Sequence, residues 1–456
     1  MNPASTATEP LVSVIILGWG GEPYIETCLH ALRQQTYARR EVLVVDNASP
    51  DDTAQIVENQ FPEISLIRTP SNLGVAGGNN VGLRAAQGDI LVLINADVEV
   101  TPNWMEQLVR AMLSDPGIGI AGAKLLYPDS TIQFAGGRIE SPRGYTWHIG
   151  WHEADEGQWD SLRDVDFVTG ASLAITRHAL QQIGYQDEEF YPIDYEDPDF
   201  SYRARAAGFR VVLVPTAVAI HHESSTTGAT STSRMLSLEA GRVRFVCKHW
   251  STERLREEFF PAEYEFLEKG SPLNRQVMQW AYLKALHEID DLAEWRLRLG
   301  TASTAESRAA LTELLTRLRH ACLPRSTDAP PERITDILGA WFAPETSAPA
   351  TASHALLLAL YGMSGRVEPH QPVAWPHWPP GLWPKVTALY KKTVRRLLRW
   401  YINPMVEQQN AINAVLMYAV ETLAQEVVLL RGRQNRDRTA LDDSSEKDGA
   451  DLERVE

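Results

Sequence analysis

Two polar residues, two positions apart, follow the most apolar short run of the chain. Residues 90–94 are an unbroken aliphatic run, and Asn95 and Asp97 stand just beyond it. Such a run is typical of a strand buried on both faces, and alternation then puts Asn95 and Asp97 on the same side. An amide oxygen and a carboxylate at that edge suit Mg²⁺ or Mn²⁺ beside a diphosphate. A plain polar turn after the strand is the alternative.

A second candidate lies in the acid-rich turn at residues 187–199, where Asp197 precedes Pro198. Because proline disfavours the α conformation in the residue before it, Asp197 is predicted to be a helix N-cap. A helix N-terminus favours the charged form of a carboxyl group, and a carboxylate there can accept a proton from a hydroxyl. A purely capping role is the alternative. Asp199 and Arg203 are predicted to form an ion pair on the same helix.

The elements that must position these residues alternate between strands and helices. Strands are predicted at 11–17, 41–45 and 64–67, with helical segments between them. This order is the signature of a parallel sheet with crossover helices. Asp46 ends the second strand, where it either contacts a ligand or caps the next helix, which is predicted to start at Ser49.

A segment rich in glycine and asparagine, residues 71–80, precedes the central strand. It is predicted to let the backbone approach a ligand closely, with the amide side chains supplying donors and acceptors. A helix is predicted only after it, through residues 83–86. A strand is predicted at 118–126, and another at 165–175.

Between these strands, residues 127–164 are rich in glycine, tryptophan and histidine, and they predict a long functional loop or an irregular excursion. Its aromatic residues are candidates for a surface that binds an acceptor, and packing inside the protein is the alternative. These residues are Trp147, His148, Trp151 and His152.

Composition narrows the class of protein. The 456 residues predict two or three units, and the net charge of −16 argues against DNA or RNA as the main partner. Three cysteines, far apart and without metal spacing, suggest a reducing compartment. We expect no signal peptide in residues 1–10 and no transmembrane helix, and therefore a cytoplasmic protein with peripheral membrane contact as an option.

Several motifs, in the right order, resemble the family-2 glycosyltransferases with a GT-A fold, close to the rhamnosyltransferase-like branch. The resemblance extends over about residues 10–250. The pieces that carry it are Val12-Ser13-Val14-Ile15-Ile16, Val44-Val45-Asp46-Asn47-Ala48-Ser49, Asn72-Leu73-Gly74, Asn79, Asn95-Ala96-Asp97, and Glu196-Asp197-Pro198-Asp199 with Arg203.

The resemblance implies an inverting, metal-assisted transfer of a hexosyl or rhamnosyl group from a nucleotide-diphosphate-sugar donor to a glycan or lipid-linked acceptor, in bacterial surface polysaccharide or glycan assembly. Asp97 and His221 would bind Mg²⁺ or Mn²⁺, and Asp197 would be the catalytic base. The residues that would bind the nucleotide-sugar are Asp46, Asn72, Gly74, Asn79, Asn95 and Asp97.

The fold class implied is α/β: a GT-A nucleotide-sugar-binding domain with a mainly parallel central sheet, followed by a helical C-terminal extension. The last helices are expected to mediate self-association or membrane contact, or to pack on the chain's own domain. The predicted segments are a disordered N-terminus (1–10), the GT-A domain (11–250), a helical extension (251–365), a Pro/Trp-rich linker (366–384), amphipathic, coiled-coil-like helices (385–431) and a disordered acidic tail (432–456).

Two other functions stay open from the residues alone. Gly18 and Gly20 begin like the phosphate-binding fingerprint of a dinucleotide-binding oxidoreductase, but Pro23 stands where its third glycine belongs. A non-catalytic scaffold that binds sugar nucleotides is the second alternative, because Asn95 replaces an acidic residue and the helical extension is long.

Overall fold

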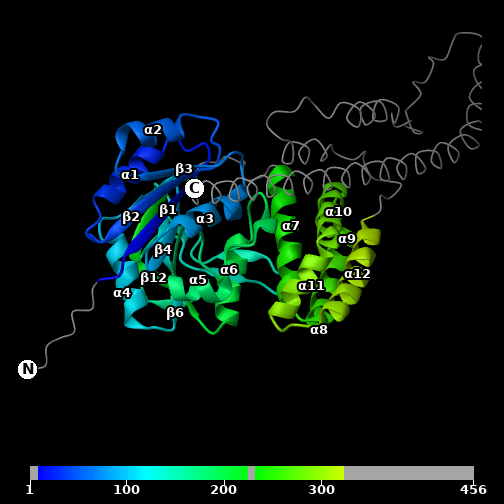
Figure 1. Ribbon diagram of the computed structural model, residues 1–456. Coiled ribbons are helices and arrows are strands. Elements are labelled where there is room, and N and C mark those ends of the chain that lie inside the picture. Colours follow the sequence, from blue (N-terminus) through cyan, green and yellow to red (C-terminus); the bar gives the residue numbers. More distant parts are fainter. Residues whose placement is uncertain (1–8, 224–231, 323–456) are drawn as a thin grey trace, which may run out of the picture. The chain divides into compact units, whose positions relative to one another are not determined.

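The architecture is a central sheet flanked by helices, as the computed structural model in Figure 1 shows for residues 9–223 and 232–322. The sheet order is β10-β12-β6-β11-β4-β1-β2-β3, with β5 paired to β12 and β7 to β6. The strands are β1 (Val12–Gly18), β2 (Arg40–Asp46), β3 (Ser65–Arg68), β4 (Ile90–Asn95), β5 (Val98–Val100), β6 (Ile118–Leu126), β7 (Ile132–Phe134), β8 (Gly137–Ile139), β9 (Thr146–His148), β10 (Arg163–Asp164), β11 (Ser172–Thr176) and β12 (Arg210–His221).

Helices connect the strands and continue beyond them. The α/β part contains α1 (Ile25–Arg33), α2 (Thr53–Gln60), α3 (Gly74–Ala85), α4 (Trp104–Ser114), α5 (Arg177–Ile183), the short η1 (Glu188–Phe190) and α6 (Glu196–Ala206). The later helices are α7 (Thr232–His249), α8 (Thr252–Arg254), η2 (Leu255–Phe259), α9 (Phe260–Lys269), α10 (Pro272–His287), α11 (Ile289–Arg298) and α12 (Thr304–Ala321).

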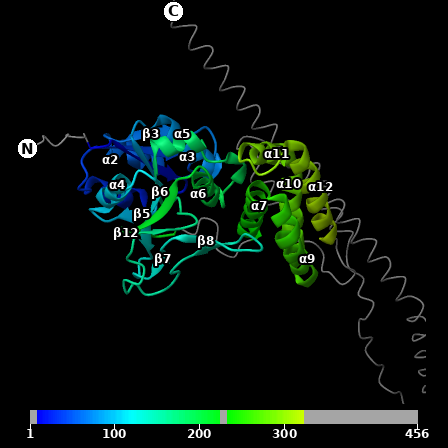
Figure 2. The same ribbon diagram turned by 90° about the horizontal axis from the view of Figure 1, so that it is seen from below.

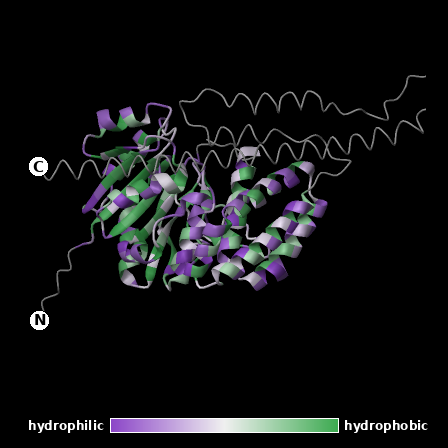
Figure 3. Cartoon of the chain, turned by 45° about the vertical axis from the view of Figure 1, so that its right-hand side comes forward, coloured by the Kyte–Doolittle hydropathy of each residue, from purple (hydrophilic) through white to green (hydrophobic). Residues whose placement is uncertain are grey.

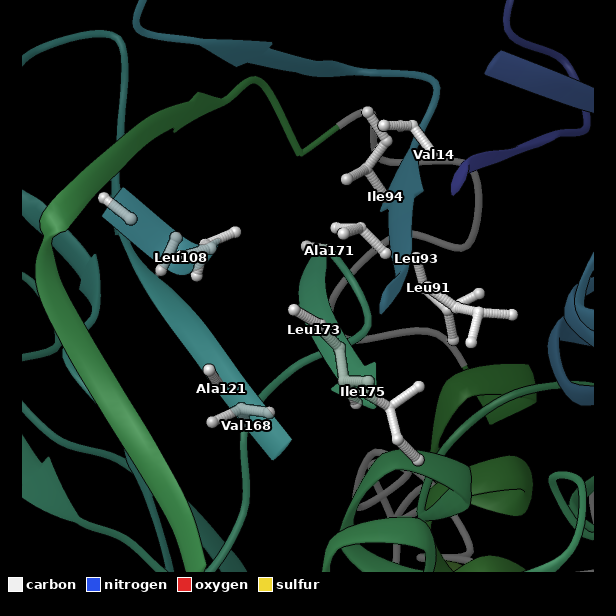
Figure 4. Close-up of a cluster of buried hydrophobic side chains, with 14 of the residues drawn as sticks. Val14, Leu91, Leu93, Ile94, Leu108, Ala121, Val168, Ala171, Leu173 and Ile175 are labelled. Atoms are coloured by element: carbon white, nitrogen blue, oxygen red, sulfur yellow. The ribbon is translucent and has the colours of Figure 1, made fainter. Parts of the chain in front are cut away.

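The predicted fold class is confirmed. Strand β1 pairs in parallel with β2 and β4, and β2 with β3, whereas β11 is antiparallel to both β4 and β6. Apolar residues line the strands (Figure 3), and side chains from β4, β11 and α4 meet in the core (Figure 4). The buried side chains labelled there include Leu91, Leu93, Leu108, Leu173 and Ile175.

The glycine- and asparagine-rich segment differs from its prediction, because most of it is helix α3. Its glycines serve close helix–strand packing. A Cβ atom on Gly78 would come within 2.4 Å of Leu17, and one on Gly82 within 2.3 Å of Ile15. The low helix propensity of these residues is therefore overridden by contact with β1.

Three other boundaries also differ. Helix α2 begins at Thr53 rather than at Ser49, and only Ser172–Thr176 of the strand predicted at 165–175 is a strand. The excursion at 127–164 contains the short strands β7 to β10, and Figure 2 shows β7 and β8 apart from the helices that cover the sheet.

Buried ion pairs join helix α7 to the α/β part. Asp187 accepts hydrogen bonds from Lys248 Nζ and Arg244 Nη2, each at 2.7 Å, and Arg244 also pairs with Glu288 at 2.9 Å. All four side chains are almost fully buried. The two cations hold the pKa of Asp187 well below its usual range, even though burial alone would raise it.

We expect Asp187→Ala to lower the free energy of unfolding by about 3–5 kcal/mol, because removing one partner leaves buried cations uncompensated. Urea denaturation followed by circular dichroism measures the change. The exposed pair of Asp290 and Arg308 provides the control, and Asp290→Ala should change stability little. Equal stability of Asp187→Ala and wild type would contradict a structural role for these ion pairs.

None of the helices in the described ranges is long and apolar enough to cross a membrane. The linker predicted at 366–384, the helices predicted at 385–431 and the tail predicted at 432–456 lie outside those ranges.

Candidate active site

Asp97 and His221 meet at one edge of the sheet. Strand β5 pairs antiparallel with the end of β12, with Val98 opposite His221, and this pairing carries Asp97 to the histidine. The distance from His221 Nε2 to Asp97 Oδ1 is 3.1 Å, and the His222 amide donates to the Asp97 carbonyl oxygen at 3.0 Å. The two residues predicted to bind a metal therefore lie side by side.

Gln133 of β7 orients the imidazole of His221. Gln133 Nε2 donates to Glu223 Oε2 at 3.2 Å, so its Oε1 faces His221 Nδ1, 2.7 Å away. A hydrogen bond there requires a proton on Nδ1, and Nε2 is the ring nitrogen that is turned toward Asp97. Gln133 was not predicted as a site residue, because it lies in the excursion, which has no clear periodicity.

The donor set fits a divalent cation that keeps open positions. A carboxylate oxygen and an imidazole nitrogen suit Mn²⁺ or Mg²⁺. The described residues contain no group of three acidic, histidine or cysteine side chains that could hold an ion. Asn95 ends β4 beside Leu17 and is half-buried at the same edge. A metal here would therefore take further ligands from a diphosphate and water.

Asp46 is buried at the end of β2, next to Gly18 of β1. Its Oδ1 accepts a hydrogen bond from the Ser49 amide at 3.2 Å, which shapes the turn after the strand. The β1 register also places Asn95 beside Leu17, one residue before Gly18. Asp46 and Asn95 therefore reach the same edge of the sheet.

Asn72 and Gly74 form the turn that begins α3, and the neighbouring Asn47 holds it. Asn72 Oδ1 accepts from Asn47 Nδ2 at 3.1 Å and from the Gly74 amide at 2.8 Å. The Asn47 side chain also accepts from the Leu73 amide and donates to the Gly74 carbonyl. The structure thus gives Asn72 and Gly74 a clear turn role, and nucleotide contact by them stays a prediction.

Gly74 has a φ of +72°, and a Cβ atom there would lie 2.8 Å from Tyr191 Cδ2 and 2.9 Å from the Pro192 carbonyl oxygen. We expect Gly74→Ala to destabilise the fold by about 1–3 kcal/mol or more, because left-handed backbone and a clash add together. Thermal unfolding tests this. Gly300→Ala, at a similar φ of +69° but with no atom within 4 Å of its Cβ, separates the two effects and should cost less. Equal losses would show that the contact with Tyr191 is unimportant.

Asp197 lies inside the first turn of α6, so its prediction as the N-cap was wrong. The helix starts at Glu196, after Tyr195 in a left-handed conformation. Asp197 Oδ2 accepts from the Gly170 amide at 2.5 Å, and Oδ1 accepts from Gln186 Nε2 at 3.4 Å. The Asp197 carboxylate therefore accepts hydrogen bonds from Gly170 and Gln186, which precede α6, instead of capping α6.

The expectation that the helix end lowers the pKa of Asp197 was also wrong. Burial raises the pKa to about 6, although the hydrogen bonds from Gly170 and Gln186 act in the opposite direction. The residue as a whole is only partly buried. Its pKa is therefore close to the value at which a general base is both ionised and basic at neutral pH.

Asn79 is linked to Asp197 through the side chain of Gln186. Asn79 Nδ2 donates to Gln186 Oε1 at 3.0 Å, and Gln186 in turn reaches Asp197. The neighbouring Asn80 accepts from the Gln186 amide at 2.9 Å. Gln186 was not predicted, since a single glutamine before an acidic turn carries no pattern. Contact of Asn79 with a nucleotide stays a prediction.

The predicted pair of Asp199 and Arg203 is confirmed at 2.8 Å, fully buried. Lys248 and His249 of α7 also bind the Asp199 carboxylate, at 2.7 and 2.8 Å. These bonds fix the helix that carries Asp197. Asp199 is therefore occupied by cations, which separates its role from that of Asp197.

Part of this chain is similar in sequence to known proteins. The model of glycosyl transferase family 2 matches residues 13–184. The O-antigen biosynthesis protein RfbC of Myxococcus xanthus is 30% identical over 226 residues, which are 47% of this chain and 18% of that protein. The N-acetylglucosaminyl-diphospho-decaprenol L-rhamnosyltransferase of Mycobacterium tuberculosis is 27% identical over 247 residues, 49% of this chain and 80% of that protein.

The uncharacterized protein y4gI of Sinorhizobium fredii is 30% identical over 253 residues, 53% of this chain and 28% of that protein. This chain thus spans less than a third of y4gI and of RfbC. Among solved structures, GalNAc-T7 with UDP, GalNAc and Mn²⁺ aligns with a TM-score of 0.49 at 15% identity, over 68% of this chain and 58% of that one. By this match, residues 13–184 belong to a domain of glycosyl transferase family 2, and Asp197 and His221 lie beyond the matched residues.

Proposed function

We propose that this protein is an inverting, metal-assisted glycosyltransferase that moves a hexosyl or rhamnosyl group from a nucleotide-diphosphate-sugar to a hydroxyl of a glycan or lipid-linked acceptor. The observation that carries the proposal is the Asp97–His221 pair at the sheet edge together with Asp197, in a chain whose residues 13–184 match the family-2 model. The names of the Myxococcus and Mycobacterium relatives support surface polysaccharide or glycan assembly as the setting.

In this proposal each residue has a separate task. Asp46 and Asn95 would face the nucleotide end of the donor, and Asp97 and His221 would hold Mg²⁺ or Mn²⁺. The bound cation would offset negative charge on the departing diphosphate. Gln133 keeps the ring of His221 turned toward Asp97, which limits reorganisation of the site.

Asp197 removes the proton from the acceptor hydroxyl as that oxygen attacks the anomeric carbon. The bond from this carbon to the diphosphate oxygen breaks at the same time, and attack from the opposite face inverts the configuration. Gly170 and Gln186 hold the carboxylate in place, and their hydrogen bonds leave lone pairs on it for the incoming proton.

A screen of purified protein against a panel of nucleotide-sugars, with release of nucleoside diphosphate as the readout, tests the proposal. One donor is expected to be turned over well above the others. No release from any donor, with and without added Mn²⁺, would contradict it. Binding without release would favour a non-catalytic scaffold.

A further inference from the structure

Two tryptophan side chains of the excursion stand open to solvent. Trp147 is 53% exposed and Trp151 is 49% exposed. Their ring centroids are 6.0 Å apart, and the ring planes meet at 86°. Exposing such large apolar surfaces to water is unfavourable, so an exposed aromatic pair indicates a binding surface.

The structure holds both rings in place. Trp151 Nε1 donates to Tyr127 Oη at 3.0 Å, and Tyr127 stacks on His152 with centroids 4.9 Å apart. Trp147 is on β9, where the next residue, His148, packs inward against Phe134. Alternation along the strand therefore keeps Trp147 outside, and the two indole faces are set before any ligand arrives.

The segment that bears these rings is attached to both parts of the candidate site. Gln133 of β7 binds His221, and Tyr127 interacts with Glu223, which also holds Gln133. At the other end, Tyr195 Oη donates to the Gly144 carbonyl oxygen at 2.9 Å, and Tyr195 directly precedes the helix of Asp197. The aromatic pair thus belongs to the segment that links the metal pair with the base.

Charge next to the pair favours a neutral polar ligand. Acidic residues are frequent at positions 153–160, and Lys124 is already paired with two of them, Asp155 and Asp160. Carboxylates accept hydrogen bonds from hydroxyl groups, whereas they repel an anionic membrane surface. The C–H edges of a pyranose carry partial positive charge and suit the negative face of an indole.

We propose that Trp147 and Trp151 form the platform on which a sugar ring of the acceptor stacks. This proposal rests on the proposed function, since it is the transfer reaction that demands a hydroxyl-bearing acceptor near Asp197. It adds the acceptor's chemical class at the point of contact: a neutral pyranose rather than a lipid chain.

Saturation-transfer NMR with millimolar methyl glycosides of glucose, rhamnose and N-acetylglucosamine tests the platform. With wild-type protein, at least one glycoside should show a saturation-transfer signal. Trp147→Ala and Trp151→Ala should weaken the binding of that glycoside by about 2- to 10-fold. The control is Tyr264→Ala, an exposed aromatic on α9, which should bind like wild type. Circular dichroism melting confirms that the variants fold.

Absence of a saturation-transfer signal with wild-type protein, or equal glycoside binding by all variants, would overturn the proposal. Loss of binding to phosphatidylglycerol vesicles in the tryptophan variants, with sugar binding retained, would also overturn it in favour of a membrane surface. Nucleotide release from the donor by wild type, measured without acceptor, tests the proposed function separately. Release without an aromatic contribution to sugar binding would therefore refute only the platform.

Discussion

Asp197→Asn should abolish most sugar transfer while the protein remains folded and binds its donor. Asparagine keeps an oxygen that accepts the Gly170 amide bond, but it cannot take a proton from the acceptor. Loss of a general base lowers the rate by about 10²–10⁴-fold. Single-turnover transfer measures the rate, and calorimetric titration with the donor measures binding.

Asp199→Asn is not a suitable control, since its carboxylate is tied to buried cations. Gln186→Glu tests the surroundings of the base more directly. This change keeps the size of the side chain but replaces the amide group that donates a hydrogen bond to Asp197 with a carboxyl group. A second acid would raise the pKa of Asp197 further. Transfer by Asp197→Asn within a few-fold of wild type would place the base elsewhere, with Glu196 the next residue to test.

The pH dependence of the transfer rate should reflect the ionisation of Asp197. Because burial raises the pKa of Asp197 to about 6, the base is protonated below that value and ionised above it. We expect kcat/KM to fall as pH drops through about 6, rather than through the ordinary value near 4 of an aspartate. A profile flat down to pH 4.5 would contradict this assignment.

Asp97→Ala should lose nearly all turnover and weaken Mn²⁺ binding, because it removes the charged oxygen beside His221. Chelator should have the same effect on wild type, and added Mn²⁺ should restore wild type only. Calorimetric titration with Mn²⁺ gives a readout that does not depend on catalysis. His222→Ala is the matched control, since this neighbouring histidine pairs with Glu99. Full activity in excess chelator would rule out metal assistance.

The sequence predicted the elements that carry regular patterns. The aliphatic run before Asn95 and the alternation of strands and helices gave the parallel half of the sheet, because burial on both faces leaves a strong signal. The meeting of Asp97 with His221 was reached only through the family resemblance. Their contact depends on the pairing of β5 with β12, between residues 124 positions apart.

The remaining errors have local causes. Glycines at 78 and 82 have low helix propensity, yet they fit α3 against β1 where larger side chains would collide. Pro198 predicted an N-cap at Asp197, but Tyr195 takes the left-handed conformation and the helix starts earlier. Gln133 and Gln186 escaped notice because amide side chains that orient other groups show no sequence period.

The buried ion pairs of α7 limit how the chain can be divided. The family match ends at residue 184, which invites a short catalytic fragment. Yet Arg242 binds Glu263 at 2.7 Å and Arg244 binds Glu288, so a fragment that ends near residue 250 would take one carboxylate partner from each of two buried guanidinium groups. We therefore expect a stable independent fragment to need residues well beyond the family match, and a graft of another family member's catalytic domain onto these helices to need both sides of the charge pairs exchanged together.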